Sequence, residues 1–589
     1  MMNVAERTHA NAPAETARWL DRFAEALRGN DTGAAAALFI EDGLWRDILA
    51  FTWTIETMSG RDAISSRLNE TAKRTQAGDF HIPPQRTPAR WVTRAGTQCI
   101  EALFAFETAL GRCNGVLRLV PDPQAPDTLR AWTLVTILDE LKGHEEAFKR
   151  RTPDDEAGLR DYGGPNWLDR RKQAARYDDH EPAVVVVGAG QAGLSIAARL
   201  TQLGVDTLIV DRHARVGDNW RKRYHSLTLH NERHVNHLPY MPFPSTWPTY
   251  IPKDMLANWF EAYADAMELN VWTGTELLSG SYDDAQHRWT LTLRCADGSE
   301  RHVRPRHLVF ATGVSSIPFT PDLPGLKDFA GVVSHSGAFD HPERWKGRKA
   351  LVLGTGTSGH DVAQELHTCG ADVTIIQRSK TYVVSLPEAQ SVYAIYREGI
   401  PFEDCDLLAT SFPYPVLQRS YQLSTAKSRE VDRPLLDALA KAGFRLHFGE
   451  DDTGFQMMYL RRGGGYYFDV GCSQLIISGA IKLMQFADIE RFVGQGARLK
   501  NGRVVPADLL VLATGYLSQQ DAVRHFLGDR IADSIGPVWG FDDGGELRNM
   551  WRRTAQAGLW FTAGSLAQCR IFSRYLALQI KAIEEGIIA

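Results

Sequence analysis

The sequence has few cysteines and no long apolar run. Its seven cysteines among 589 residues stand far apart, and no pair has the spacing of a zinc site or of a CxxC redox motif. We therefore expect reduced thiols and no metal site. The first fifteen residues lack the apolar core of a signal peptide, and no stretch of about 18 apolar residues indicates a membrane span. These absences predict a cytoplasmic protein with no membrane association.

Charges of both signs are nearly balanced, with 66 Lys and Arg against 71 Asp and Glu and a formal net charge of −5. Such a balance provides no electrostatic attraction to nucleic acid or to an anionic membrane. Signatures of several other chemistries are also missing: there is no G-x-S-x-G elbow, no HExxH motif and no paired-carboxylate motif. The chain is too long for one core, and its length predicts about three or four domains.

The strongest local signal is a glycine-rich turn between a buried strand and a helix. From Ala183 the chain reads AVVVVGAGQAGLSIAARLTQLGVDTLIVD. Gly188 permits a tight turn, Gly190 lets a pyrophosphate approach the backbone, and Gly193 lets the helix lie close to the strand. Unpaired N–H groups at the helix N-terminus then face the phosphates. Asp211 ends the next strand, where a carboxylate can accept from ribose hydroxyls, so the unit predicts a dinucleotide site.

A second unit repeats this pattern with one change. Residues 349–380 read KALVLGTGTSGHDVAQELHTCGADVTIIQRSK, with a strand, glycines at 354, 356 and 359, a helix and a second strand. Gly354, Gly356 and Gly359 predict another phosphate loop. Where the first unit has Asp211, this one has Arg378, whose guanidinium can fork onto a ribose phosphate. The second site is therefore expected to bind NADPH, the alternative being that Arg378 is a solvated cation at a strand end.

Two apolar strands end in the same tripeptide, Ala-Thr-Gly. They are found in RHLVFATGVSSIPFTPDLPG (306–325) and ADLLVLATGYLSQ (507–519). Gly313 and Gly515 would let the chain leave the sheet beside a dinucleotide, and Thr514 and Gly515 are predicted to contact the cofactor. Such a pair indicates crossings between two dinucleotide domains, one of which is inserted into the other.

The segment between the glycine loops, FAGVVSHSGAF (329–339), carries a motif of its own. Phe329, Gly331, His335 and Phe339 match the fingerprint F-x-G-x-x-x-H-x-x-x-(Y/F/W), and residues 181–589 thereby resemble the class B flavin-dependent monooxygenases. The resemblance implies FAD and NADPH as cofactors and oxygen transfer through a peroxyflavin. It also implies that this segment links the two nucleotide domains and that His335 takes part in catalysis. The alternative for His335 is a hydrogen-bonded packing residue.

A further stretch resembles the YUCCA-type branch of the same family, which oxidises indole-3-pyruvate. It is YHSLTLHNERHVNHLPYMPFP, which begins at Tyr224. In the animal-type branch an Asn near the flavin lies six residues after the tyrosine; here that place is His230, and Asn231 follows it. Both are therefore predicted as catalytic residues, with equal weight. Trp220, just before this stretch, is predicted to contact the cofactor.

The N-terminal residues resemble a different fold, the SnoaL-like cone. Two amphipathic helices are expected first, then a strand around Trp45, then strands near 99–108, 113–120 and 129–139. In such cones an acidic pocket residue can act as acid or base, which makes Asp42, Asp47 and Glu56 candidates. No catalytic dyad is evident from spacing, and a structural role for this domain, in dimerisation or in covering the flavoenzyme, is the favoured interpretation.

Together these signals predict an α/β protein with two Rossmann-like dinucleotide-binding domains, the NADPH domain inserted in the FAD domain, and an N-terminal α+β cone domain. The expected partners are a small-molecule substrate and dioxygen, and a homodimer is a further expectation. The predicted boundaries are 1–141 for the cone, 142–180 for a charged linker, 181–340 and 501–589 for the two parts of the FAD-binding domain, and 341–500 for the NADPH-binding domain.

The predicted function is an FAD- and NADPH-dependent monooxygenase that inserts one oxygen atom from dioxygen into a small organic substrate. Three alternatives remain open. The same flavin chemistry could perform Baeyer–Villiger or decarboxylative keto-acid oxygenation. The two nucleotide sites could instead serve a flavin NADPH oxidase or reductase, or a redox-sensing interaction protein without enzymatic activity.

Overall fold

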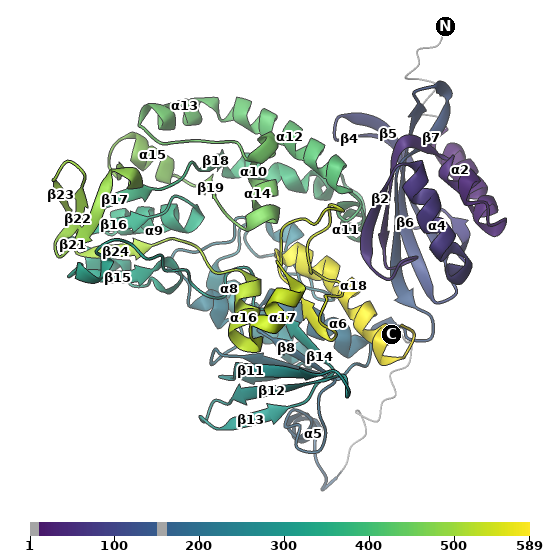
Figure 1. Ribbon diagram of the computed structural model, residues 1–589, viewed down its shortest axis with the longest axis horizontal. Coiled ribbons are helices and arrows are strands. Elements are labelled where there is room, and N and C mark those ends of the chain that lie inside the picture. The colour runs from purple at the N-terminus through teal and green to yellow at the C-terminus, as the bar shows by residue number, and fades with distance from the viewer. Residues whose placement is uncertain (1–10, 150–161, 589) are drawn as a thin grey trace.

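The computed structural model describes residues 11–149 and 162–588. A seven-stranded sheet near the N-terminus lies on one side of the molecule, and two five-stranded parallel sheets lie in the remainder (Figure 1). The predicted α/β class with two Rossmann-like sheets is confirmed. Within the described residues no helix is long and apolar enough to span a bilayer.

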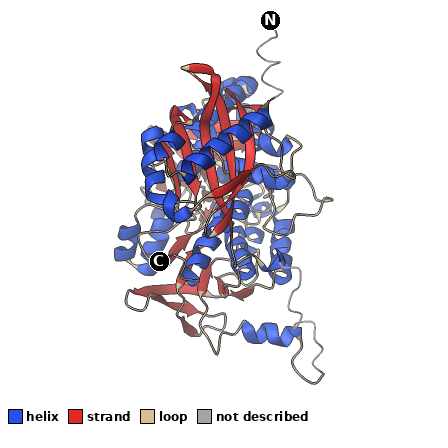
Figure 2. Ribbon diagram, turned by 90° about the vertical axis from the view of Figure 1, so that its right-hand side faces the viewer, coloured by secondary structure: helices blue, strands red, loops and turns tan. Residues whose placement is uncertain are grey.

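The N-terminal unit is a mixed sheet with helices on one face. Figure 2 shows the helices lying across the strands. The apolar residues of the first helix recur at helical spacing, and its Trp19 and Phe23 are buried against the sheet, where Phe23 meets Phe80 edge to face. The strand order is β2-β1-β7-β6-β5-β3, with β4 paired to β5. The elements are α2 (Ala12–Arg28), α3 (Thr32–Ala36), β1 (Phe39–Ile48), β2 (Ile55–Ser59), α4 (Arg61–Thr75), β3 (Gly78–His81), β4 (Arg90–Arg94), β5 (Thr97–Glu107), β6 (Gly111–Asp122) and β7 (Ala125–Leu141).

The predicted strands of this unit are confirmed as β1, β5, β6 and β7. Its assignment to the cone fold stays a prediction. The second face of the sheet meets the rest of the chain, since β7 contacts α18 (Leu566–Glu584) and β6 contacts α11 (Phe402–Ala409). Part of the predicted linker, residues 150–161, lies outside the described residues. After it comes α5 (Trp167–Ala174), where the indole N–H of Trp167 donates to Glu268 at 2.8 Å.

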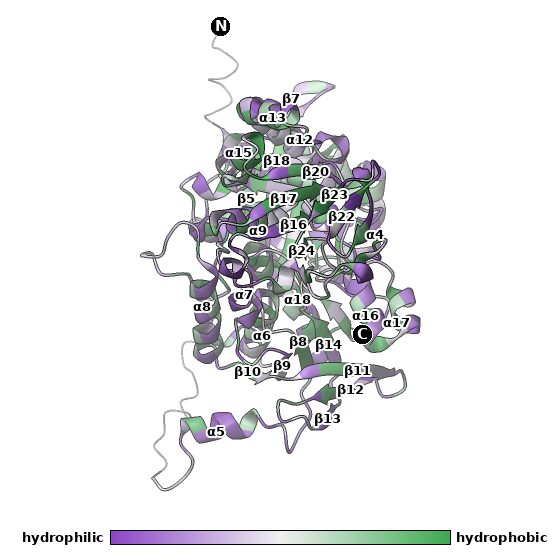
Figure 3. Ribbon diagram, turned by 90° about the vertical axis from the view of Figure 1, so that its left-hand side faces the viewer, coloured by the Kyte–Doolittle hydropathy of each residue, from purple (hydrophilic) through white to green (hydrophobic). Residues whose placement is uncertain are grey.

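The first parallel sheet has the order β10-β9-β8-β14-β25, which is a Rossmann arrangement. Its inner strands β8 and β14 are buried at every position and mostly apolar, and Figure 3 shows their hydrophobic character. The last strand and helix come from the C-terminus, so the sheet closes with residues far along the chain. The elements are β8 (Val184–Val187), α6 (Gln191–Gln202), β9 (Thr207–Asp211), α7 (Asp218–Arg221), α8 (Lys253–Ala266), β10 (Asn270–Thr273), β14 (His307–Phe310), β25 (Leu559–Phe561) and α18.

The second parallel sheet has the order β15-β24-β16-β17-β20. Its strands are β15 (Val332–His335), β16 (Lys349–Leu353), β17 (Asp372–Gln377), β20 (Lys482–Gln485) and β24 (Leu509–Leu512), and α9 (Thr357–Thr368) follows β16. The predicted boundaries assigned β15 and β24 to the FAD-binding parts, but both pair inside the second sheet. The chain therefore passes from the first parallel sheet to the second before β15, and it returns to the first sheet after β24.

The remaining elements connect or flank these sheets. Two three-stranded antiparallel sheets and one two-stranded parallel pair are added to them. The strands are β11 (Glu276–Asp283), β12 (Arg288–Arg294), β13 (Glu300–Val303), β18 (Tyr382–Ser385), β19 (Tyr466–Asp469), β21 (Ile489–Val493), β22 (Gly496–Leu499) and β23 (Val504–Pro506). The helices are α10 (Leu386–Ala389), α11, α12 (Tyr414–Val431), α13 (Arg433–Lys441), α14 (Gly454–Arg462), α15 (Cys472–Ile477), α16 (Gln519–Leu527) and α17 (Asp529–Ile535).

Candidate active site

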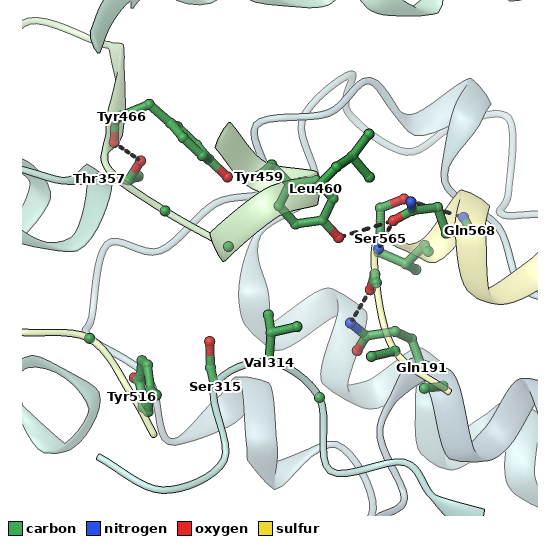
Figure 4. Close-up of a pocket in the computed structure, with 18 of the residues that line it drawn as sticks. Gln191, Val314, Ser315, Thr357, Tyr459, Leu460, Tyr466, Tyr516, Ser565 and Gln568 are labelled. Atoms are coloured by element: carbon green, nitrogen blue, oxygen red, sulfur yellow. Dashed lines mark hydrogen bonds between the residues drawn. The ribbon is translucent and has the colours of Figure 1, made fainter. Parts of the chain in front are cut away.

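One cavity of about 1400 Å³ is lined by both glycine loops. Ligands bind α/β sheets beyond the carboxyl ends of the strands, and this is where both loops lie. Figure 4 shows Gln191 of the first loop and Thr357 of the second on opposite sides of the cavity, with Tyr466 beside Thr357. The hydroxyl of Thr357 donates to the backbone oxygen of Tyr466 at 3.3 Å. The two predicted nucleotide sites therefore open into a shared space.

The first loop has the geometry that a phosphate cradle requires. Gly188 has φ +111°, and a Cβ there would lie 2.8 Å from the carbonyl oxygen of Ala311. A Cβ on Gly193 would lie 1.8 Å from the oxygen of Gly188. Helix α6 begins after Gly190 with no side chain capping it, so its first N–H groups are available to a ligand in the cavity.

Asp211 lies at the end of β9 and lines the same cavity. Its carboxylate accepts hydrogen bonds from the backbone N–H of Ala189 at 2.6 Å and from the ring and backbone N–H of His213 at 2.8 Å. Burial alone would raise the pKa of Asp211, but these hydrogen bonds hold it below its usual value. The group is therefore an ionised acceptor beside the loop, as a ribose site requires.

Several buried polar atoms around the first loop have no hydrogen-bond partner among the described residues. The indole of Trp220 donates to Gln191 at 3.2 Å. The neighbouring Asn219 lies under Gly190, and its Oδ1 is buried without a hydrogen bond; the side-chain oxygens of Thr312 and Ser316 are in the same state. All three line the cavity. Buried unpaired oxygens fit a polar ligand that donates hydrogen bonds, which a nucleotide does. Asn219 was missed because it belongs to no spacing motif.

The second loop repeats the geometry of the first. Gly354 has φ +124°, and its Cβ would lie 2.3 Å from the oxygen of Ala513. A Cβ on Gly359 would lie 2.1 Å from the oxygen of Gly354, and α9 begins after Gly356 without a side-chain cap. In the turn after β24, Thr514 donates to the oxygen of Phe319 at 2.5 Å, and Gly515 has φ +84°. Both turn residues line the cavity.

Arg378 follows β17 at the edge of the cavity, and its side chain is exposed. Among the described residues it has neither an ion pair nor a side-chain hydrogen bond, and the same holds for Lys380. Arg445 lies next to them, since its guanidinium donates to the backbone oxygen of Arg378 at 2.7 Å. Three cations without a neutralising carboxylate fit a phosphate group.

The fingerprint residues form a joint around β15. A Cβ on Gly331 would lie 2.5 Å from both the Phe329 ring and the oxygen of Asp508, so only glycine fits there. Phe329 and Phe339 are buried in two different apolar clusters of the second sheet. His335 bonds to the turn after β24, and it does not itself line the cavity, although the next three residues do. Its contacts are those of a positioning residue.

His230 and Asn231 both line the cavity. The ring of His230 meets Phe468 edge to face, with centroids 4.6 Å apart, and burial lowers its pKa to about 4. It is therefore a neutral imidazole at physiological pH. The backbone oxygen of His230 accepts from Gln390 at 2.7 Å and that of Asn231 from Asn236 at 3.0 Å, which fixes the segment.

An aromatic wall is the part of the site that sequence reasoning missed. It comes from residues 393–468, where no spacing motif marks it. Burial raises the pKa of its tyrosines, so they stay neutral. The wall consists of Tyr393, Tyr396, Phe412, Tyr421, Phe455, Tyr459, Tyr466 and Phe468.

The acidic candidates of the N-terminal unit do not line this cavity. Asp42 is exposed, and Glu56 pairs with Arg67 at 2.8 Å. Asp47 is fully buried and accepts hydrogen bonds from Phe51, Thr52 and Thr136. Its position is that of a satisfied structural acid. The described residues contain no group of three or more side chains suited to a metal ion.

Comparisons with known proteins agree with this geometry. The family model "Pyridine nucleotide-disulphide oxidoreductase" matches residues 182–398. Indole-3-pyruvate monooxygenase YUCCA1 of Oryza sativa subsp. japonica is 31% identical over 363 residues, which are 62% of this chain and 83% of that protein. Probable indole-3-pyruvate monooxygenase YUCCA4 of Arabidopsis thaliana is 32% identical over 57% of this chain and 76% of its own. A flavin-containing monooxygenase structure from Stenotrophomonas maltophilia aligns at TM-score 0.46 and 19% identity, over 68% of this chain and 98% of that one.

The chain thus belongs to the flavin-dependent monooxygenase family, and it is an enzyme whose cofactors are FAD and NADPH. Since the family model begins at residue 182, it does not test the N-terminal cone.

Proposed function

We propose that this enzyme holds FAD at the first loop and NADPH at the second, and transfers one atom of dioxygen to a small aromatic substrate in the shared cavity. The observation that carries the proposal is that both loops, with their helix N-termini, line a single cavity. This arrangement would let NADPH deliver hydride to the flavin, and the shared cavity leaves space for a substrate beside both cofactors. Dioxygen and the substrate are the remaining partners; a homodimer and a cytoplasmic location stay predictions.

The cofactor roles follow from the chain's own groups. Asp211, held ionised, is suited to the FAD ribose, and Asn219 and Trp220 flank the same loop. Arg378, with Lys380 beside it, is suited to the 2′-phosphate of NADPH. FAD bound at the first loop would supply the chemistry of oxygen transfer from dioxygen, with NADPH at the second loop as the source of hydride. The apolar and neutral aromatic lining would exclude water from it.

The aromatic wall supports a flat, aromatic substrate, since aromatic faces recognise other aromatic rings by stacking and edge contacts. His230 would meet it as a neutral group, because burial lowers its pKa to about 4. The two plant relatives are named indole-3-pyruvate monooxygenases, so a keto acid is one substrate to be tested. An aryl sulfide, a soft nucleophile, is the other.

The test measures oxygen transfer directly. Purified holoenzyme is supplied with NADPH and ¹⁸O₂ and with either indole-3-pyruvate or methyl phenyl sulfide. Substrate-dependent NADPH use with one ¹⁸O atom in the product is expected. Hydrogen peroxide stoichiometric with NADPH for every substrate would instead identify a flavin oxidase or reductase.

A further inference from the structure

The N-terminal unit contributes directly to the wall of the cavity. Its lining residues are Arg46, Ile55, Thr93, Arg94 and Ala95. Figure 1 shows β4 on the side of the N-terminal sheet that faces α12. This part of the cavity wall is separate from the two nucleotide loops.

The tip of the β4–β5 hairpin reaches α12. The hairpin closes with a two-residue turn, in which Ala95 has φ +49° and Gly96 has φ +79°. Positive φ at both positions is the type I′ geometry that matches the twist of a hairpin, but it is uncommon for alanine. A Cβ on Gly96 would lie 3.1 Å from the side chain of Leu423 in α12. The same helix supplies Leu417 and Tyr421 to the cavity, so Ala95 stands at the seam between the two units.

A partly buried charge network holds this seam. The Arg94 guanidinium bonds to Glu398 at 2.5 and 3.1 Å and to Glu101 at 2.6 and 2.9 Å. Arg90 also reaches Glu398, at 2.5 Å. Burial alone would raise the pKa of both carboxyls, but the arginines hold the pKa of Glu101 at about 2 and that of Glu398 below its usual value. The two carboxylates are therefore charged, and Glu398 is the member that joins the two units, since its partners Arg90 and Arg94 belong to the N-terminal unit.

A second contact anchors the other end of the same wall segment. Arg118, fully buried, donates to the backbone oxygen of Ser411 at 2.9 Å and to its hydroxyl at 2.6 Å. Its guanidinium lies 4.4 Å from the ring centre of Phe412. Residues 393–412 carry Tyr393, Tyr396 and Phe412 of the aromatic wall, and they are thus held near Glu398 and again at Ser411. Loss of Arg94 would leave Glu398 with Arg90 as its only ion-pair partner among the described residues, so the hold on the segment would weaken.

We propose that the N-terminal unit is the specificity-determining wall of the oxygenation cavity. In this arrangement Arg94 positions the segment 393–412, and Ala95 limits the size of substrate that fits beside α12. This inference rests on the proposed function, because it assigns that cavity to the substrate.

The first test follows the segment itself. Hydrogen exchange of residues 390–412 is measured in holoenzyme carrying Arg94→Met, Arg94→Lys or the control Arg112→Met, whose guanidinium pairs with Glu140 and Glu145 away from the seam. We expect the exchange rate to be at least fivefold faster in Arg94→Met than in wild type. Arg94→Lys should give an intermediate rate, and the control Arg112→Met should exchange at the wild-type rate. The KM for indole-3-pyruvate or methyl phenyl sulfide should rise at least fivefold, while flavin reduction by NADPH without substrate stays within twofold.

The second test addresses size. The kcat/KM ratio of methyl phenyl sulfide to methyl naphthyl sulfide should rise at least fivefold in Ala95→Leu. Gln76→Leu is the matched control, since Gln76 also has positive φ, +50°, and does not line the cavity. Unchanged exchange in Arg94→Met, or an unchanged ratio in Ala95→Leu, overturns the inference. A wild-type enzyme that oxygenates none of the probes contradicts the proposed function, while the exchange measurement still decides whether Arg94 holds the wall.

Discussion

His335 donates a hydrogen bond from Nε2 to the backbone oxygen of Gly515, 3.0 Å away. Its Nδ1 accepts from the N–H of Gly337, also at 3.0 Å, so both ring nitrogens are in use and the ring is neutral. Burial, aided by the charge of Arg223, lowers its pKa in spite of the bond to Gly515. The histidine thus ties β15 to the turn after β24, beside the predicted cofactor-binding residues Thr514 and Gly515.

His335→Ala should uncouple NADPH oxidation from oxygen transfer without stopping NADPH oxidation. NADPH oxidation is expected within about threefold of wild type, but the fraction of oxygen released as peroxide should rise severalfold because the joint no longer holds the second sheet in place. Because the pKa is lowered, the ring in the folded enzyme stays neutral below the ordinary histidine value of about 6.5, so wild-type coupling should persist there and fall only at lower pH. His341→Ala, at an exposed site, is the control. Wild-type coupling in His335→Ala would refute the positioning role.

Gly193→Ala should lose FAD. The added Cβ would lie 1.8 Å from the oxygen of Gly188, so the turn and the helix must separate. We expect purified protein to carry less than about a tenth of the wild-type flavin, measured by absorbance after denaturation. The control is Gly78→Ala, where nothing lies within 4 Å of the new atom. Full flavin content in Gly193→Ala would place FAD elsewhere.

Arg378→Ala should discriminate between the two nicotinamide coenzymes. A charge-assisted contact to the 2′-phosphate contributes about 1.5–3 kcal/mol, which predicts a roughly tenfold to hundredfold rise in the KM for NADPH. The KM for NADH should hardly change. Arg498→Ala removes a cation of the same region that pairs with Glu490, and it should change neither constant. Equal effects of Arg378→Ala on both coenzymes would show that another group binds the phosphate.

Asp361→Asn should flatten the pH dependence of stability. The hydroxyl of Tyr224 donates to Asp361 at 2.6 Å and connects the segment after α7 to α9. Burial, with the charge of Glu365, raises the pKa of Asp361 to about 6 against the effect of that hydrogen bond. The folded state therefore favours the protonated acid. The contribution of Asp361 to the free energy of unfolding is lost as the pH rises from about 4 through about 6.

An asparagine keeps the acceptor without the charge. The melting temperature of Asp361→Asn should match wild type near pH 4 and exceed it at pH 7, by a free energy of at most about 3 kcal/mol. Parallel melting curves for the two proteins over pH 4–7 would contradict this assignment.

Asp47→Ala should destabilise the N-terminal unit without stopping oxygenation. The change leaves the buried donors of Phe51, Thr52 and Thr136 without an acceptor, at a cost on the order of 1–3 kcal/mol. Turnover of folded protein at low temperature is expected within about twofold of wild type, assayed by NADPH use with substrate. A loss above tenfold in protein that is still folded would restore Asp47 as an acid–base candidate.

The two nucleotide loops could be predicted because their signals are local. Each glycine loop, its strand and its helix lie within about 30 contiguous residues. The tight turn of that unit is what requires glycine at positions 188 and 354. The predicted boundaries placed β24 in the FAD-binding part because an apolar strand that ends in Ala-Thr-Gly fits either parallel sheet, and only its pairing with β16 decides between them. β15 has no such ending, and it joins the second sheet by pairing with β24.

The wall of the cavity could not be predicted for a different reason. Its charges are satisfied by residues far apart in sequence: Arg46 pairs with Glu546 and Arg94 with Glu398. In the sequence each of these side chains is an ordinary surface charge. Asp47 was a candidate because acids in a pocket are reactive, yet its surrounding donors could be found only in the structure.

The closing strand of the first parallel sheet has a consequence for biosynthesis. The N-terminal sheet is complete at residue 141, whereas β25 and α18 are made last. Domains fold as they emerge from the ribosome, N-terminal first. The nascent N-terminal unit must therefore wait with Arg46 lacking its carboxylate partner until Glu546 has been translated. Arg118 already pairs with Glu101 of its own unit and lacks only its contacts with Ser411. The cavity is consequently assembled only after these later segments have been made, and slower translation between them prolongs the time for which this face is available to chaperones.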